Sequence, residues 1–474
     1  MKLRFLINNL LGLSVIFYLS PLYGFDDYFS EGSMRVDYFH TGTAEREYFS
    51  IDRIYHESTW GGSRKHLIDT TDRGKYMYRV YDIRTNQLIY SKGFSSIYGE
   101  WETTGEASGG PVKTFHESAV FPFPDKTIQF VIAKRNRQGR FEEIFNTVID
   151  PASNRVHREY HGRGYKAKQF IHNGDPARKV DILIVGDGYT KEEIRKFDAD
   201  VKRFTGELFD ISPFKERKKD FNVWTIEIAS RESGVDEPTK GFWKTTPLGI
   251  SYNSLDTPRY VLTLENRALR DIASNAPYDQ LYIIFNSERY GGGGIFNFFS
   301  TCYSGTENES NSWWADYVFV HEFGHAFAGL GDEYYSSDVA YTDFFIAGVE
   351  PWEPNVTALL DPENVKWDRH VDDGTPLPTP WDKVRYDSLG TIRQGLDRDS
   401  ENYAKEVEKI DAERTGILEG GEWAGKVGSY EGAGYASEGM YRPRLNCIMF
   451  TKNLESFCPV CKEAIEEVID FYTK

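Results

Sequence analysis

Two hydrophobic patterns divide the chain. Up to about residue 150, apolar and aromatic residues alternate with polar ones, which is typical of strands with one buried face. The clearest example is residues 75–94, where the alternation continues on both sides of Thr85-Asn86, as in a β-hairpin. A second pair of strands is predicted at residues 127–134 and 141–149. Several short strands with turns between them predict an antiparallel β-sandwich over residues 25–150.

From residue 178 the pattern predicts buried strands that alternate with helices. Residues 180–185 (VDILIV) are continuously apolar, as in a central strand. Thr190 and Glu193 have the spacing of a capping box, and apolar residues then recur at helical intervals. Further strands are predicted at residues 221–229 and 280–286, and a helix at residues 258–273. The chain is therefore predicted to be α+β, with a second domain over residues 178–474.

Two segments have little periodicity. Residues 151–177 combine basic residues with Gly and Asn, and we predict a solvated linker there. Residues 350–440 are rich in Pro and Gly and are expected to be mostly loops. The four glycines at 291–294 lack the Lys-Ser/Thr of a phosphate-binding loop, so we interpret them as a flexible turn.

The first 24 residues have the order of a cleavable export signal. Lys2 and Arg4 precede an apolar run at residues 5–19, and Gly24 offers a small residue at the end. The run is short for a spanning helix, and no other stretch approaches membrane length. We therefore predict a signal peptide at residues 1–24, no stable membrane insertion, and a secreted, periplasmic or cell-surface protein.

The charge excludes some partners. The 474 residues carry a formal charge of −17, and without residues 1–24 the chain has 54 basic and 73 acidic side chains, a charge of −19. Such a chain is a poor nucleic-acid binder, because phosphate contacts depend on Lys and Arg, and it is also unsuited to anionic lipid.

Residues 321–325 carry the clearest chemistry. His321-Glu322-Phe323-Gly324-His325 is the H-E-x-x-H pattern of zinc sites. Four residues on a helix turn by about 400° and rise about 6 Å, so both imidazoles leave one face, one turn apart. Two neutral imidazoles suit Zn²⁺, and Glu322 beside them can accept a proton from water activated at the metal.

A third ligand is expected shortly after the second histidine. Gly329 and Gly331 can end the helix, so that the chain folds back and brings Asp332 to the metal. Glu333 is the close alternative. In the thermolysin arrangement the third ligand would be a Glu near residue 345. No Glu stands there, and Glu350 lies later than that arrangement expects. We favour Asp332 as the third ligand and keep Glu333 as the open alternative.

The run HEFGHAFAGLGDEYY resembles the metzincin metallopeptidases, and more closely the igalysins, the IgA-specific metallopeptidases. The later Gly439-Met440-Tyr441-Arg442-Pro443 and Cys447-Ile448-Met449 are similar to the same family. Gly329 and Asp332 each fall one step later than the general metzincin pattern. The resemblance covers roughly residues 178–474. It implies a zinc peptidase domain with a twisted sheet, an active-site helix, a cleft, and Met449 as the Met-turn under the histidines.

The four cysteines all lie in the C-terminal half: Cys302, Cys447, Cys458 and Cys461. The Cys458–Cys461 pair is a CxxC, which can be redox-active or half of a zinc site. No second CxxC exists, so we interpret the cysteines as structural, joined by disulfides whose connectivity the sequence does not fix.

These observations predict an exported zinc endopeptidase that acts on protein or peptide substrates. The resemblance implies immunoglobulin A or another host glycoprotein as a substrate. Two alternatives remain open, an adhesion protein on a peptidase scaffold and an amidase that acts on cell-wall peptide. Residues 295–303 (IFNFFSTCY) are expected to form the edge strand above the cleft, where an extended peptide could add as another strand.

Overall fold

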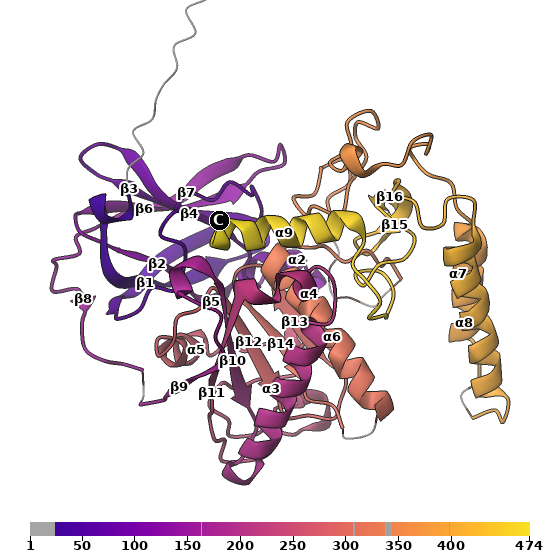
Figure 1. Cartoon of the computed structure of the whole chain (residues 1–474), viewed down its shortest axis with the longest axis horizontal. Coiled ribbons are helices and arrows are strands. Elements are labelled where there is room, and N and C mark those ends of the chain that lie inside the picture. The colour runs from indigo at the N-terminus through magenta and orange to yellow at the C-terminus, as the bar shows by residue number, and fades with distance from the viewer. Residues whose placement is uncertain are drawn as a thin grey trace, which may run out of the picture.

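The computed structural model describes residues 24–162, 164–306, 309–336, 339, 341, 344–397 and 399–474. It contains several sheets and nine α-helices within these residues, which confirms the α+β class (Figure 1). The predicted signal peptide lies outside the described residues, apart from Gly24.

The N-terminal part consists of two four-stranded sheets. The first has the order β5-β1-β2-β8, with β1 (Phe29–Gly42), β2 (Glu47–Glu57), β5 (Lys113–Pro124) and β8 (Val156–His157). The second has the order β4-β3-β6-β7, with β3 (Tyr76–Asp82), β4 (Gln87–Phe94), β6 (Ile128–Arg135) and β7 (Phe141–Ile149). Their inner faces share one apolar core, in which Phe121 of β5 stacks on Phe130 of β6 with ring centroids 5.9 Å apart. The two sheets therefore pack face to face, as alternating strands require.

The second sheet system has the order β13-β14-β12-β10-β11-β9. Its central strands β10 (Val180–Asp187), β11 (Phe221–Ile226), β12 (Gln280–Phe285) and β14 (Phe299–Tyr303) are parallel, whereas β9 (Ala167–Ile171) and β13 (Gly292–Ile295) are antiparallel edges. Every residue of β10 and β12 is buried, which accounts for sequences that are mostly apolar instead of alternating.

The segment predicted as a linker contributes to both sheet systems. Strand β8 pairs in parallel with β2 of the N-terminal sheet, and β9 pairs with β11 of the second. Residues 151–177 therefore include two paired strands rather than only solvated chain. Their pattern is weak because β9 is a mostly exposed edge strand, which leaves little apolar periodicity to detect.

Three long helices cover one face of the second sheet. They are α3 (Ile194–Leu208), α6 (Glu309–Ala328) and α9 (Pro459–Thr473), and α3 and α6 lie side by side in front of the strands in Figure 1. The predicted capping box of Thr190 and Glu193 is present, just before α3. The predicted helix at residues 258–273 is shorter, α5 (Asn266–Ala273), and packs against β5 of the N-terminal part. The other short helices are α1 (Ile97–Trp101), α2 (Gly105–Ser108) and α4 (Phe214–Arg217).

The region predicted to be loops contains a projecting helical pair. Helices α7 (Lys383–Gln394) and α8 (Tyr403–Gly420) extend to one side of the molecule, and the hairpin β15 (Tyr430–Ala433) and β16 (Ala436–Arg442) follows (Figure 1). The pair is joined by ion pairs, Arg385 with Glu413 at 2.5 Å and Arg393 with Asp411 at 3.1 Å. Much of the surface of α7 and α8 is exposed, so the periodic hydrophobic pattern that indicates a packed helix is weak in this segment.

The glycine run forms strand β13 and is not a flexible turn. A Cβ on Gly294 would lie 2.3 Å from the carbonyl oxygen of Glu322, and one on Gly292 would lie 2.7 Å from the side chain of Val318. Both contacts are with α6, so the glycines let the strand approach the helix closely.

The edge-strand prediction for residues 295–303 is wrong in its position. Strand β14 is hydrogen-bonded on both sides, to β12 and to β13, and the edge strand is β13. On its outer side, Gly292 exchanges backbone hydrogen bonds with Arg259 and Val261, each 3.2 Å long. The apolar run predicted a single strand, but a turn at residues 296–298 divides it. Its only polar residue is Asn297, which adopts a left-handed conformation with φ of 54°.

Gly294→Ala is expected to lower the free energy of unfolding by about 1–3 kcal/mol, because the added methyl group forces β13 away from α6. Gly206→Ala on α3 is the control, since its Cβ would meet nothing within 4 Å and alanine is the better helix former. Denaturant titration measures both. Equal stability of the two variants would contradict the close packing described here.

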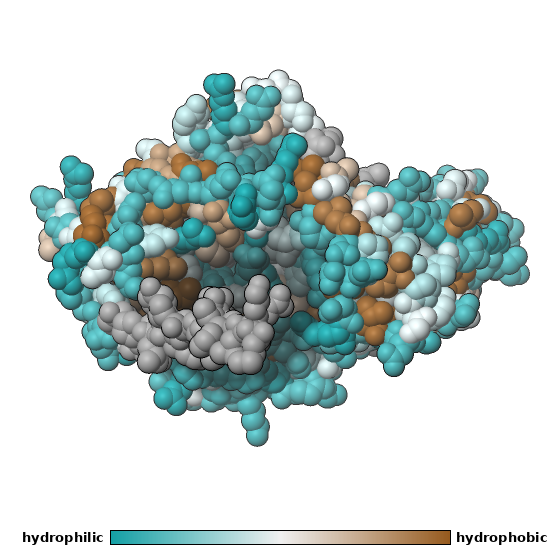
Figure 2. All heavy atoms as spheres, turned by 90° about the horizontal axis from the view of Figure 1, so that it is seen from above, coloured by the Kyte–Doolittle hydropathy of each residue, from teal (hydrophilic) through white to brown (hydrophobic). Residues whose placement is uncertain are grey.

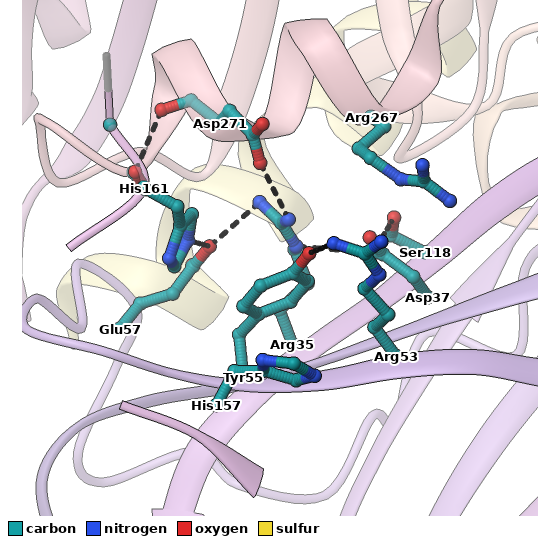
Figure 3. Close-up of polar contacts among 12 residues, drawn as sticks. Arg35, Asp37, Arg53, Tyr55, Glu57, Ser118, His157, His161, Arg267 and Asp271 are labelled. Atoms are coloured by element: carbon teal, nitrogen blue, oxygen red, sulfur yellow. Dashed lines mark hydrogen bonds and ion pairs between the residues drawn. The ribbon is translucent and has the colours of Figure 1, made fainter. Parts of the chain in front are cut away.

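A buried arginine ties the N-terminal sheets to the rest of the chain. Arg35 of β1 is fully buried and pairs with Glu57 at 2.9 Å, Asp37 at 3.1 Å and Asp271 of α5 at 2.7 Å. Figure 3 shows the guanidinium between Glu57 and Asp271, above the ring of Tyr55. Removing one partner of a buried ion pair costs much free energy, because the other charge is left buried and unpaired. The Arg35 contacts therefore hold α5 and the N-terminal sheet in a fixed relation.

None of the helices in the described ranges combines the length and apolar character needed to cross a membrane. In the view from above, hydrophobic residues lie in separate patches among hydrophilic ones (Figure 2).

Candidate active site

Helix α6 places the two histidines. Its residues from Tyr317 to Val320 are buried, because α6 lies between the sheet and the C-terminal segment. His321 and His325 leave the same face, and their Nε2 atoms are 3.1 Å apart. The predicted one-turn spacing therefore brings two donor nitrogens to one point.

Asp332 supplies a third donor at the same point. The helix ends at Ala328, and Gly329 takes a left-handed conformation with φ of 64°, which turns the chain back. Oδ1 of Asp332 then lies 3.1 Å from Nε2 of His321 and 3.3 Å from Nε2 of His325. Glu333 points elsewhere, into a cluster of cysteines.

The three donors fit a metal ion. Ligands held about 2.0–2.1 Å from a tetrahedral zinc are separated by about 3.3 Å, close to the observed spacings. Oδ1 of Asp332 is buried and has no hydrogen-bond partner among the described residues, so it is free to bind a cation. Burial opposes ionisation, but His325 and His321 hold the pKa of Asp332 well below its usual range.

Backbone carbonyl groups orient both imidazoles. Nδ1 of His321 lies 3.2 Å from the carbonyl oxygen of Ile448, and Nδ1 of His325 lies 2.5 Å from that of Leu330. An Nδ1–H that donates to a carbonyl leaves Nε2 unprotonated and aimed at the metal position. The loop after α6 and the distant segment around residue 448 thus both fix the ligands.

Glu322 lines a cleft of about 810 Å³ together with His325 and Asp332. Burial raises the pKa of Glu322, and the two neighbouring histidines oppose this rise. A carboxylate with a raised pKa beside a metal position is suited to accept and return a proton.

Met449 lies fully buried beneath the helix. Its Sδ atom packs so closely on α6 that a Cβ on Gly324 would approach it to 3.2 Å. Met449 thus contacts the helix at Gly324, between the two histidines.

Two groups at the site were missed by sequence reasoning. The hydroxyl group of Tyr435 donates a short hydrogen bond to Oδ2 of Asp332. Glu100, from α1 of the N-terminal part, lines the cleft and accepts hydrogen bonds from Tyr260 at 2.6 Å and Tyr341 at 2.7 Å. Neither lies in a motif that spacing alone would reveal, although Tyr435 lies shortly before the family-like segment at residues 439–443.

Tyr435→Phe is expected to weaken zinc binding by about 10–100-fold, because the hydroxyl group that orients the Asp332 carboxylate is lost. Tyr430→Phe is the matched control, since that hydroxyl bonds the carbonyl groups of Trp423 and Lys426 instead. Competition with a chromophoric chelator measures both affinities. Equal affinities would remove Tyr435 from the site.

Glu100→Ala is expected to lower the free energy of unfolding by about 1–3 kcal/mol, because two buried hydroxyl groups lose their acceptor. Burial raises the pKa of Glu100 to about 7 even though both tyrosines stabilise its charge. The control is Glu31→Ala, whose exposed ion pair with Arg64 contributes only about 0.2–1 kcal/mol. Thermal unfolding compares the two, and a loss no greater than that of the control would contradict the role of Glu100 in the cleft wall.

The arrangement defines the class. Two histidines one helical turn apart, a returning aspartate and an adjacent glutamate in a cleft are the centre of a metallopeptidase. A family model described as IgA Peptidase M64 matches residues 169–469, and one described as Peptidase M64 N-terminus matches residues 24–146. The chain belongs to the IgA peptidase M64 family, which confirms the resemblance to the IgA-specific metallopeptidases.

Other comparisons add little. A search of curated proteins finds no match. Among solved structures, the chain is similar to metalloproteinase-II from Bacteroides fragilis, with 12% identity and a TM-score of 0.20, over 49% of this chain and 82% of that one.

Proposed function

We propose that the protein is an exported zinc-dependent endopeptidase that hydrolyses peptide bonds within protein substrates. The observation that carries this proposal is the set of three donor atoms 3.1–3.3 Å apart beside Glu322, in one cleft. Export is supported by the signal-like order of residues 1–24.

His321, His325 and Asp332 would hold the zinc ion. Two imidazole nitrogens and one carboxylate oxygen form a donor set that zinc accepts, with a further position left for water or substrate. When bound, zinc supplies Lewis-acid chemistry, which polarises a carbonyl group and lowers the pKa of water. Met449 would form the apolar floor of a Met-turn, as the family resemblance implies.

Glu322 moves the proton. Its carboxylate accepts a proton as water attacks the scissile carbonyl, and it then delivers that proton to the nitrogen of the leaving amine. The partial burial of Glu322 favours this return, because burial disfavours the charged carboxylate and raises its pKa. The cleft walls from the N-terminal part and the peptidase part hold the peptide between them.

The substrate is proposed to be a folded or extended protein, with immunoglobulin A the first to test, because the family is named for it. Fold and zinc motif do not transmit substrate choice, so other host glycoproteins belong in the same test. A purely adhesive protein would have no need of Glu322 or of both histidines, and the chain retains all three.

The test is incubation of residues 25–474 with immunoglobulin A and with a diverse protein mixture, followed by mapping of new termini by mass spectrometry. Glu322→Gln serves as the matched inactive protein. Cuts inside protein chains that this variant does not make support the proposal. Release of peptides from cell-wall fragments alone would replace it with the amidase alternative, and the absence of any cut would favour the adhesive one.

A further inference from the structure

A second group of metal-ligating side chains lies behind the active site. Cys447 stands two residues before Met449, Cys458 and Cys461 open helix α9, and Glu333 directly follows Asp332. All four side chains are buried, with residue exposures of 0–1%. One ligand atom from each lies within 4.8 Å of the others.

The spacing of these atoms fits a tetrahedral metal site rather than a disulfide. The Sγ atoms of Cys447 and Cys461 are 3.8 Å apart, whereas a disulfide needs about 2.05 Å. Two thiolates at about 2.3 Å from a tetrahedral zinc are separated by about 3.8 Å. The 3.3 Å between Sγ of Cys461 and Oε1 of Glu333 is near the corresponding sulfur–oxygen separation of about 3.5 Å. The structure has four free cysteines and no disulfide, so the predicted disulfides are not formed.

Two backbone N–H groups donate to sulfur atoms of the cluster. The backbone N–H of Cys458 donates to Sγ of Cys447 at 3.2 Å, and that of Cys461 donates to Sγ of Cys458 at 3.5 Å. Cys458 is the N-cap of the 15-residue helix α9, with Pro459 at its first position, so the positive end of the helix faces the sulfur atoms. N–H groups aimed at sulfur are the surroundings that metal-bound thiolates receive.

Glu333 forms no ion pair in the described part of the chain. Oε1 accepts a hydrogen bond from Asn355 at 3.0 Å, and Oε2 is buried without a partner. The nearby guanidinium of Arg442 donates to the carbonyl groups of Glu431 and Gly432, and no ion pair joins it to Glu333 in the described residues. A buried carboxylate beside three cysteines is costly unless a cation balances it.

We propose that Cys447, Cys458, Cys461 and Glu333 bind a second, structural zinc ion, distinct from the ion at His321. Three sulfur ligands and one oxygen ligand leave no position for substrate, and complete burial closes the site to it. The ion would fix the active site from behind. The backbone N–H of Glu333 donates to the carbonyl oxygen of Met449 at 2.9 Å. Because Glu333 directly follows Asp332, a metal bound at Glu333 would fix the positions of both Asp332 and Met449.

The two ions can be told apart by sulfur, which only the second site contains. After metal removal, loading with Co²⁺ should give a sulfur-to-cobalt charge-transfer band in the near ultraviolet. The same band should persist in the double variant His321→Ala/His325→Ala, whose catalytic site cannot bind metal. The outcome therefore does not depend on whether the protein cleaves any substrate.

Metal counting gives the second readout. Elemental analysis of the full chain should find two zinc ions in the wild type and one in Cys461→Ser. Cys302→Ser is the matched control, since Cys302 is equally buried but bonds the carbonyl oxygens of Tyr303 and Ala315 away from the cluster, and it should keep two. Should Cys461→Ser fail to fold, the cobalt spectrum of the wild type still decides. A wild type with one zinc ion, no charge-transfer band, and a disulfide within the cluster by non-reducing mass spectrometry would overturn the proposal.

Discussion

Glu322→Gln is expected to reduce peptide cleavage by on the order of 10²–10⁴-fold while leaving the catalytic metal in place. The amide matches the carboxylate in shape but cannot accept the proton that hydrolysis releases. Glu322 lines the cleft beside His325 and Asp332, and Asp332 is assigned to the metal, with its Oδ2 accepting a hydrogen bond from Tyr435.

The measurement combines turnover on a protein substrate with metal content and thermal unfolding. Asp316→Asn is the matched control, because Asp316 lies on the same helix and pairs with Arg203 at 3.0 Å, away from the metal position. It should lose some stability and retain cleavage. A Glu322→Gln protein that holds its metal and still cleaves would remove Glu322 from the mechanism.

Asp332→Asn is expected to weaken metal binding at the histidines by on the order of 10²-fold or more, with a matching loss of cleavage at limiting zinc. The substitution keeps the side-chain volume and removes the anionic donor from between the two imidazoles. A neutral amide is a poor zinc ligand, and the two histidines alone leave the ion with too few protein ligands. Titration of the metal-free protein with zinc gives the affinity.

Glu333→Gln separates the two acidic candidates for the third ligand. It should leave zinc at His321 and His325, since Glu333 faces the cysteines, and it should weaken the sulfur-rich site instead. With Co²⁺, Asp332→Asn should keep the sulfur charge-transfer band, whereas Glu333→Gln should alter it. If Glu333→Gln empties the histidine site and Asp332→Asn does not, our assignment of the third ligand is wrong.

Local sequence predicted the elements that depend on near neighbours. The H-E-x-x-H spacing gives two imidazoles on one face because a helix repeats every 3.6 residues. Gly329 could be expected to end the helix because glycine tolerates the left-handed turn that it adopts. The buried strands β10 and β12 followed from their apolar runs, since strands covered on both faces need no alternation.

The same local reasoning failed where packing between distant segments decides the conformation. The glycines of β13 suggested a flexible turn, yet they form an edge strand because α6 lies too close for side chains. Helices α7 and α8 were missed because each buries only two residues, too few to give a clear apolar stripe. The cysteines suggested disulfides because their number is even, and their arrangement around Glu333 depends on the fold.

The chemistry proposed for helix α6, the α+β class and the family resemblance could all be predicted from the sequence, because each rests on short runs of residues whose pattern is local in the chain. The fold separates Asp332 from Glu333, since the chain after Gly329 directs one side chain to the histidines and the other to the cysteines. It alone brought Glu100 to the cleft from more than 200 residues away, and Glu333 to cysteines more than 110 residues later. Such contacts follow from the path of the whole chain through a shared core, which no local spacing records.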